Sequence, residues 1–226
     1  MLRIFLLVIS VVLFTAGCEC EKESGLPVDG DGNVYDTVVI GTQVWLKQNL
    51  KTTRYRDGTP ISLVTDNDKW ASMTGGAYCW YNNNPVYKEN YGALYNWYAA
   101  SYACPAGWHV PTKEEWETLI NYVGNDAGKL KDPQFWSCPP GYVMDCSGNN
   151  ESGFSARPGG SRAVDGTFCK IGFHLAAWWS TTSFLLPDGR TTEYYVVFIM
   201  SDGLTIYTTY GLKTGGISVR CIKNSN

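Results

Sequence analysis

Cysteine and histidine are the residues of this sequence with the greatest capacity for chemistry. The chain of 226 residues contains eight cysteines and two histidines, His109 and His174. Neither histidine has a partner at metal-ligand spacing, because the sequence contains no Cys-x-x-Cys, His-x-x-x-His or His-Glu-x-x-His pattern. His109 directly precedes a helix-capping sequence, so we expect a packed, hydrogen-bonded side chain rather than a catalytic one. The sequence predicts no metal site and no cofactor.

Carboxylates are the other groups that could catalyse a reaction. The densest acidic group is Glu114, Glu115 and Glu117, and glycoside hydrolysis needs two carboxylates about 5 to 10 Å apart. Glu115 follows Thr112 at the spacing of a capping box, so we assign it to the start of a helix and its neighbours to a solvated helix face. The sequence contains no glycine-rich phosphate loop and no serine nucleophile elbow. We therefore predict that the chain is not an enzyme.

The composition argues against a nucleic-acid-binding protein. Eighteen basic residues against 21 acidic ones give a net charge of −3, which provides no basic field for phosphates. Charged residues make up 17% of the chain, against roughly 25% in an ordinary soluble domain. The 9 Trp, 15 Tyr and 8 Phe are in excess by comparison. Low charge and many aromatic rings favour a neutral partner such as a glycan.

The N-terminus predicts export and lipid anchoring. One basic residue, Arg3, precedes an 11-residue run of aliphatic, aromatic and small residues at 4–14, shorter than the roughly 20 residues that span a bilayer. Thr15-Ala16-Gly17-Cys18 resembles a bacterial lipobox. We therefore expect residues 1–17 to be a lipoprotein signal peptide and Cys18 to be the lipid anchor, with ordinary secretion after Gly17 as the alternative.

Residues 18–32 are polar and predict a flexible tether. The acidic residues directly after Cys18 resemble the export signal of surface lipoproteins in Bacteroidetes-type bacteria. We expect an outer-membrane lipoprotein, on the periplasmic side or at the cell surface, that contacts the membrane through its lipid only.

Residues 33–226 predict a single domain, because no linker, charge block or repeat interrupts them. Two β-rich runs, 35–40 and 43–46, flank a Gly41-Thr42 turn and predict a hairpin. The segment 91–100 predicts a helix, because Ala93, Leu94, Trp97 and Tyr98 share one face at helical spacing.

A second helix is predicted from Pro111, with the capping box of Thr112 and Glu115 at its start and Gly124 as its C-terminal stop. Trp116, Leu119, Ile120 and Val123 form its apolar stripe. The later part of the chain predicts short strands bounded by turn signals, at 153–156, 177–182, 193–200, 204–210 and 217–223. Two main helices early and a mostly antiparallel sheet late predict the α+β class.

Six ordered motifs carry a family resemblance. They are Ala77-Tyr78-Cys79-Trp80-Tyr81-Asn82-Asn83, Tyr91-Gly92-Ala93-Leu94-Tyr95-Asn96-Trp97-Tyr98, Cys104-Pro105-Ala106-Gly107-Trp108-His109-Val110-Pro111-Thr112, Gly153-Phe154-Ser155-Ala156-Arg157-Pro158-Gly159-Gly160, Trp178-Trp179-Ser180-Thr181 and Ser218-Val219-Arg220-Cys221. From about Tyr35 to Lys223 the chain resembles the Fibrobacter succinogenes major paralogous domain, a family of bacterial lipoprotein modules. The resemblance implies a C-type-lectin-like fold, shared with formylglycine-generating enzymes and phage receptor-binding proteins, and implies little about activity.

The resemblance also bears on the cysteines. Lectin-like domains commonly tie the region entering an early helix to the last strand, which implies a Cys104–Cys221 disulfide. Cys138 and Cys146 flank a Gly/Pro-rich loop, where we predict a local bridge. The pairing of Cys20, Cys79 and Cys169 is left open. Formylglycine-generating enzymes hold copper with two cysteines near the C-terminal sheet, and only Cys221 lies there, so that oxidase chemistry is not expected.

Lectin-like domains bind through loops above the sheet, where this chain places aromatic rings beside polar side chains that suit sugar rings or peptide side chains. The candidate ligand-binding residues are Tyr81, Asn82, Asn83, Asn84, Tyr87, Trp178, Trp179, Arg190, Tyr207 and Tyr210. Adjacent strand residues face opposite ways, so at least one of Trp178 and Trp179 is expected in the core. We predict a recognition module for a polysaccharide or a surface protein. The alternatives are a hydrolase or other enzyme on the same scaffold, and a passive envelope protein.

Overall fold

The computed structural model describes residues 25–138, 141, 146–169, 174–189 and 192–225. Within these residues the strands form three sheets, two of them antiparallel and one mixed. Short helices and turns connect the sheets. The described chain therefore has the α+β class that its sequence predicts.

The longest strands form an antiparallel meander of β7 (Leu175–Leu185), β8 (Thr192–Met200) and β9 (Ile206–Leu212). A four-stranded sheet contains, in spatial order, β1 (Thr37–Ile40), β2 (Gln43–Leu46), β10 (Ile222–Lys223) and β6 (Trp108–His109). The third sheet consists of β3 (Ser62–Leu63), β4 (Ala77–Cys79) and β5 (Leu94–Tyr95), with β3 and β4 parallel.

The α-helices are α1 (Asn67–Ala71), α2 (Lys88–Tyr91), α3 (Trp97–Ala100) and α4 (Lys113–Val123). Single 3-10 turns lie at Tyr81–Asn83, Pro85–Tyr87 and Ala127–Lys129. Over the described part of the chain, none of the helices combines the length and apolar character that crossing a bilayer requires.

Helix α4 confirms the predicted capping signals. The Thr112 hydroxyl accepts the Glu115 backbone N–H at 3.2 Å, and the Glu115 carboxylate accepts the Thr112 backbone N–H at 2.8 Å. Gly124 ends the helix in the left-handed conformation with φ of 71°. Trp116, Leu119 and Val123 are buried, so the apolar stripe faces the core as expected.

The single helix predicted over 91–100 is wrong. Gly92 adopts a φ of 76°, and a Cβ at this position would lie 2.6 Å from the carbonyl oxygen of Leu50. Leu94 and Tyr95 then pair with β4 as strand β5. The side chain of Asn96 starts a new helix, α3, by accepting the Ala99 N–H at 3.1 Å. Tertiary strand pairing therefore overrides the local helical spacing.

The predicted strands differ in outcome. The hairpin of β1 and β2 is confirmed, with Ile40 paired to Gln43 around the Gly41-Thr42 turn. The runs at 177–182, 193–200 and 204–210 lie largely in β7, β8 and β9. The strand predicted at 153–156 is reduced to one bridge, Lys131 to Ala156. The run 217–223 is strand only at β10, because Ile217 and Ser218 instead bridge Tyr95 and Trp178.

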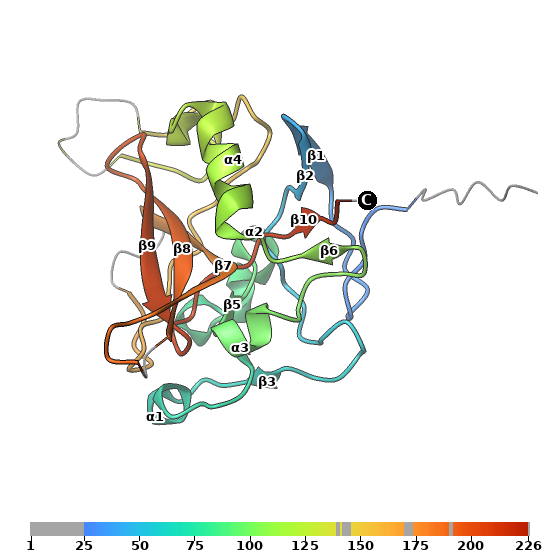
Figure 1. Cartoon of the computed structure of the whole chain (residues 1–226), viewed down its shortest axis with the longest axis vertical. Coiled ribbons are helices and arrows are strands. Elements are labelled where there is room, and N and C mark those ends of the chain that lie inside the picture. Colours follow the sequence, from blue (N-terminus) through green and yellow to red (C-terminus); the bar gives the residue numbers. More distant parts are fainter. Residues whose placement is uncertain (1–24, 139–140, 142–145, 170–173, 190–191, 226) are drawn as a thin grey trace, which may run out of the picture.

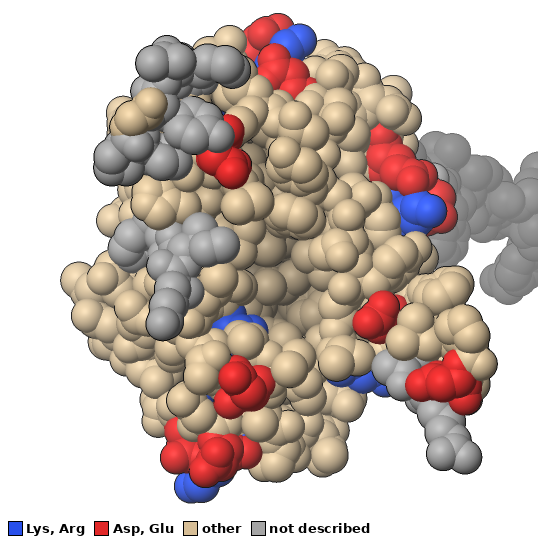
Figure 2. Space-filling model, turned by 90° about the vertical axis from the view of Figure 1, so that its left-hand side faces the viewer, with Lys and Arg blue, Asp and Glu red and all other residues tan. Residues whose placement is uncertain are grey.

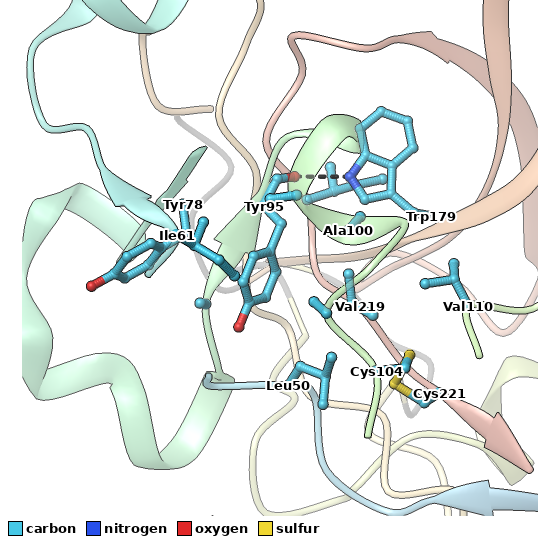
Figure 3. Close-up of a cluster of buried hydrophobic side chains, with 14 of the residues drawn as sticks. Leu50, Ile61, Tyr78, Tyr95, Ala100, Cys104, Val110, Trp179, Val219 and Cys221 are labelled. Atoms are coloured by element: carbon cyan, nitrogen blue, oxygen red, sulfur yellow. Dashed lines mark hydrogen bonds between the residues drawn. A yellow bond between two sulfur atoms is a disulfide. The ribbon is translucent and has the colours of Figure 1, made fainter. Parts of the chain in front are cut away.

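Strand β7 separates two hydrophobic cores. Trp178 belongs to the core that contains Trp45 of β2, Trp116 of α4 and Phe154. Trp179 points the other way, into the core around Tyr95, where its Nε1 donates to the Tyr95 carbonyl oxygen at 2.8 Å (Figure 3). Figure 1 shows α4 between the β7–β9 sheet and the β1–β2 hairpin. Both faces of β7 are therefore covered at Trp178 and Trp179.

The two disulfides seen in the described residues are those predicted. Cys104 and Cys221 are joined at an S–S distance of 2.07 Å across 117 residues, and Cys138 is joined to Cys146. Cys79 and Cys169 carry free thiols, and burial raises the pKa of the Cys79 thiol to about 12. Cys18 and Cys20 lie outside the described residues.

The chain is fixed to the domain earlier than the predicted tether end at residue 32. Asp29 is buried, and its carboxylate accepts hydrogen bonds from the Tyr35 hydroxyl and from the backbone N–H of Asn33 at 3.0 Å. Val28 pairs with Val34 in a β-bridge. The expectation of a flexible tether therefore does not hold for residues 27–32, while 18–24 lie outside the described residues.

Candidate functional site

The structure places the predicted ligand-binding residues in separate regions. Trp178 and Trp179 are 0% and 1% exposed, so both are core residues. Sequence alternation correctly assigned at least one of them to the core. Because the core around Trp116 covers Trp178 and the core around Tyr95 covers Trp179, neither ring lies on a ligand-accessible surface. Arg190 lies outside the described residues.

The segment from Tyr81 to Tyr87 forms two short turns rather than an open binding loop. Tyr81 is buried, and its ring meets the half-buried ring of Tyr87 edge to face at 5.9 Å. Asn83 donates from its amide nitrogen to the Thr65 carbonyl oxygen at 2.9 Å, and the amide oxygen of Asn84 accepts the Val86 N–H at 3.1 Å. Asn82 is exposed, with φ of 50°. The side-chain amides of Asn83 and Asn84 therefore bond to backbone groups and hold the conformation of this segment.

Tyr207 and Tyr210 are both exposed on β9, at 42% and 38%, but they lie on opposite faces of the strand. Tyr207 stacks on Phe198 at a centroid distance of 5.2 Å. Tyr210 contacts Tyr195 and Phe184, each at 5.7 Å. Figure 2, which views the molecule from the β9 side, shows charged side chains mainly around the margin of this face and uncharged ones in its hollowed centre.

A depression of about 600 Å³ brings together aromatic and polar side chains that sequence analysis missed. We call it the tyrosine depression, and its lining residues are Tyr55, Arg56, Asp57, Thr59 and Tyr102. Four of them belong to one tight turn, in which the Tyr55 N–H donates to the Thr59 carbonyl oxygen at 2.9 Å. The Asp57 carboxylate accepts the Thr59 backbone N–H at 2.9 Å and the Thr59 hydroxyl at 2.6 Å.

The turn is attached to the segment that carries Tyr102. Arg56 donates from Nε to the Cys104 carbonyl oxygen at 3.2 Å and from Nη2 to the Trp108 carbonyl oxygen at 3.3 Å. Cys104 is itself joined to Cys221, which fixes this segment to the core. Tyr102, which follows α3, leaves 68% of its surface exposed. The depression therefore has a rigid base and an accessible ring.

Gly76 sets the position of the Tyr55 ring. A Cβ at residue 76 would lie 1.8 Å from the Tyr55 hydroxyl oxygen, so a side chain here would collide with that hydroxyl group. At Gly75 an added Cβ would meet no atom within 4 Å. The close approach of Tyr55 therefore requires glycine at residue 76 but not at its neighbour.

The protonation states of Tyr55 and Asp57 give the depression both a hydrogen-bond donor and an acceptor. Hydrogen bonds from the side chain and backbone of Thr59 lower the pKa of Asp57, so its carboxylate is ionised at neutral pH. Burial, and then the charge of Asp57, raise the pKa of Tyr55, so its hydroxyl keeps its proton. A guanidinium, a carboxylate and hydroxyl groups beside aromatic rings can bind a polyhydroxylated ligand.

His109 has the structural role that its sequence context predicts. Its Nε2 lies 2.9 Å from the Glu115 carboxylate, and its Nδ1 lies 2.7 Å from the Asn224 side-chain oxygen. His109 therefore links β6, the start of α4 and the residues near the C-terminus.

The described residues contain no group of three or more His, Cys, Asp or Glu side chains that could hold a metal ion.

Comparison with known proteins gives one family match. The model of the family described as Fibrobacter succinogenes major domain matches residues 38–223, which is most of the chain. No curated protein and no solved structure matches the chain.

Proposed function

The chain belongs to the Fibrobacter succinogenes major domain family, and we propose that it is a binding module that recognises a neutral polysaccharide through the tyrosine depression. The proposal includes a lipid on Cys18 that anchors the module outside the cytoplasm, and a lectin-like relationship of its fold. The motivating sequence features are the lipobox-like Thr15-Ala16-Gly17-Cys18 and the low content of charged residues, 17%.

The observation that carries the proposal is the combination of Tyr102 with the guanidinium of Arg56 and the carboxylate of Asp57 in one depression. A tyrosine ring that is 68% exposed offers a flat apolar face on which a sugar ring can stack. Asp57 accepts and Arg56 donates, which suits the neighbouring hydroxyl groups of a pyranose. A concave site with few polar groups and aromatic walls is the usual form of a small-ligand site.

The same geometry favours binding over hydrolysis. Asp57 is the one carboxylate among the described residues that line the tyrosine depression. Acid–base hydrolysis of a glycosidic bond generally uses two carboxylates on either side of the bond. A passive envelope role is less well supported, because such a role gives no reason for an exposed ring above a rigid depression.

The test is a glycan array probed with the detergent-solubilised full chain, followed by calorimetry with neutral glucan, xylan and mannan oligosaccharides. Saturable binding without release of reducing ends would support a binding module. Release of reducing ends would instead favour the hydrolase. Silence with every neutral oligosaccharide would count against the proposal.

A further inference from the structure

Arg220 is a fully buried cation whose acceptors are all uncharged. Its side chain is 0% exposed. The guanidinium donates to the Asn49 side-chain oxygen at 3.1 and 2.8 Å, and to the carbonyl oxygens of Leu46, Lys47 and Phe154 at 3.0, 2.7 and 2.6 Å. No carboxylate among the described residues lies within ion-pair distance of it. These dipoles satisfy its hydrogen bonds, but they leave its positive charge without a counter-ion.

A second arginine adds to this charge. Arg157 is paired with Asp132 at 2.9 Å. Burial lowers the pKa of Arg220 to about 9, and repulsion from Arg157 contributes in the same direction. Arg220 therefore remains cationic at neutral pH, in surroundings that favour an additional negative charge.

A small cleft gives solvent access to this region. We call it the polar cleft; it has a volume of about 190 Å³, and its lining includes Gln48, Asn49, Lys51, Glu89, Arg157 and Arg220. Lys51 is paired with Glu89 at the rim, and Arg157 with Asp132. Among the described residues that line the cleft, Arg220 is the charged one without an ion-pair partner. The polar cleft thus differs from the tyrosine depression in size and in charge.

We propose that the polar cleft binds a small oxyanion, either a carboxylate or a sulfate or phosphate group. Arg157 lines the cleft; its Nε donates to Asp132 and its Nη1 donates to the Asn90 carbonyl oxygen at 3.3 Å, so we assign the contact with the anion to its second terminal nitrogen. Lys51, which is paired with Glu89, supplies a second donor. The buried charge of Arg220 attracts the anion without direct contact, since water screens charges poorly at a buried site. The proposal is independent of glycan binding at the tyrosine depression.

The test is calorimetric titration of the detergent-solubilised full chain with sulfate, phosphate, acetate and glucuronate, each against chloride at the same ionic strength. Wild-type protein should bind at least one of the four saturably. Binding of acetate and glucuronate alone would identify a carboxylate as the ligand group, and binding of sulfate or phosphate alone would identify an inorganic oxyanion.

Three variants separate the site from general charge effects. Arg157→Gln should weaken binding about tenfold or more, because it removes a charge-assisted hydrogen bond. Asn49→Asp should also weaken it, because the new carboxylate would lie beside Arg220 and supply the missing counter-charge. Lys69→Gln, at an exposed position of helix α1, should bind as wild type does. Thermal unfolding of each variant establishes that it is folded. No saturable binding up to tens of millimolar, or equal binding by wild type and Arg157→Gln, would overturn the proposal.

Discussion

The side-chain oxygen of Asn49 accepts two hydrogen bonds from the guanidinium of Arg220, at 3.1 and 2.8 Å. The same oxygen accepts the indole N–H of Trp178 at 2.9 Å. Asn49 follows β2, Trp178 lies in β7 and Arg220 precedes β10, so one buried amide joins three segments that are far apart in the sequence.

Replacing Asn49 should therefore destabilise the fold strongly. Asn49→Ala leaves two buried donor groups without their acceptor, and we expect a loss of about 2 to 4 kcal/mol in the free energy of unfolding. Asn49→Asp should cost less, because a carboxylate still accepts the hydrogen bonds from Arg220 and from Trp178, although it loses the amide N–H that donates to the Tyr91 carbonyl oxygen. Urea denaturation of both variants measures the difference. Equal stabilities of Asn49→Ala and wild type would contradict the assigned role.

The two disulfides should contribute unequally. The Cys104–Cys221 bridge spans 117 residues and the Cys138–Cys146 bridge spans 8. On the loop-entropy model, removing the long bridge should cost about 5 kcal/mol and the short one about 2.5 kcal/mol. Chemical denaturation of the paired Cys→Ser variants tests this order. Mass spectrometry under non-reducing conditions provides the control, since four or more free thiols in wild type whose Cys18 carries the lipid would show that at least one of the two bridges is absent.

Stability should depend on pH through His109 and Glu115. The hydrogen bond to Glu115 raises the pKa of His109 above 6.5, so its contribution is complete below about pH 6.5 and is lost as pH rises through the folded-state value. Burial works against a lowered pKa for Glu115, but its bonds to His109 and Thr112 outweigh burial and hold the value below 4.5. The Glu115 contribution is therefore present above about pH 4.5 and is lost as pH falls through the lowered value.

The pair should thus stabilise most between about pH 4.5 and 6.5. Because the two side chains are 33% and 23% exposed, we expect no more than about 1 kcal/mol. The measurement is the urea midpoint at about pH 5.5 and about pH 8.5, for wild type and for His109→Gln. An identical pH dependence in the two proteins would contradict this assignment.

Gly76→Ala should alter the tyrosine depression with little loss of stability. The added Cβ would collide with the Tyr55 hydroxyl, which is the far end of a side chain, and would lie 3.3 Å from the nearest backbone atom, the Cα of Ala99. We expect weaker oligosaccharide binding and a nearly unchanged thermal midpoint. Gly75→Ala is the matched control, because an added Cβ there meets no atom. Equal effects of the two substitutions on binding would argue against a role for Tyr55.

Sequence reasoning succeeded where short-range interactions decide the structure. Helix α4 begins at Thr112 and ends at Gly124, and both signals act within one helical turn. The segment 91–100 has equally good helical spacing, but its conformation depends on the approach of Gly92 to Leu50 and on the pairing of Tyr95 with β4. Both of those contacts are long-range, and the local pattern does not contain them.

The site was less predictable than the fold for a related reason. Aromatic residues serve both cores and surfaces, and the pattern around Trp178 and Trp179 does not reveal that this part of β7 is covered on both faces. The tyrosine depression unites a turn at Tyr55 with Tyr102, which are distant in the sequence. Their proximity depends on the bonds from Arg56 to the Cys104 and Trp108 carbonyl oxygens. In the sequence, the run Tyr55-Arg56-Asp57 within a turn was the signal that could have indicated this site.

Calorimetry of Tyr102→Ala against Tyr122→Ala, with the neutral oligosaccharide that binds wild type most tightly, tests the central claim most directly. The two tyrosines are similarly exposed, at 68% and 62%, but Tyr122 lies on α4, outside the tyrosine depression. We predict that Tyr102→Ala weakens binding about tenfold or more, because a stacking surface is lost, and that Tyr122→Ala leaves the affinity unchanged. Equal affinities of the two variants, or no binding of any neutral oligosaccharide by wild type, would contradict the account.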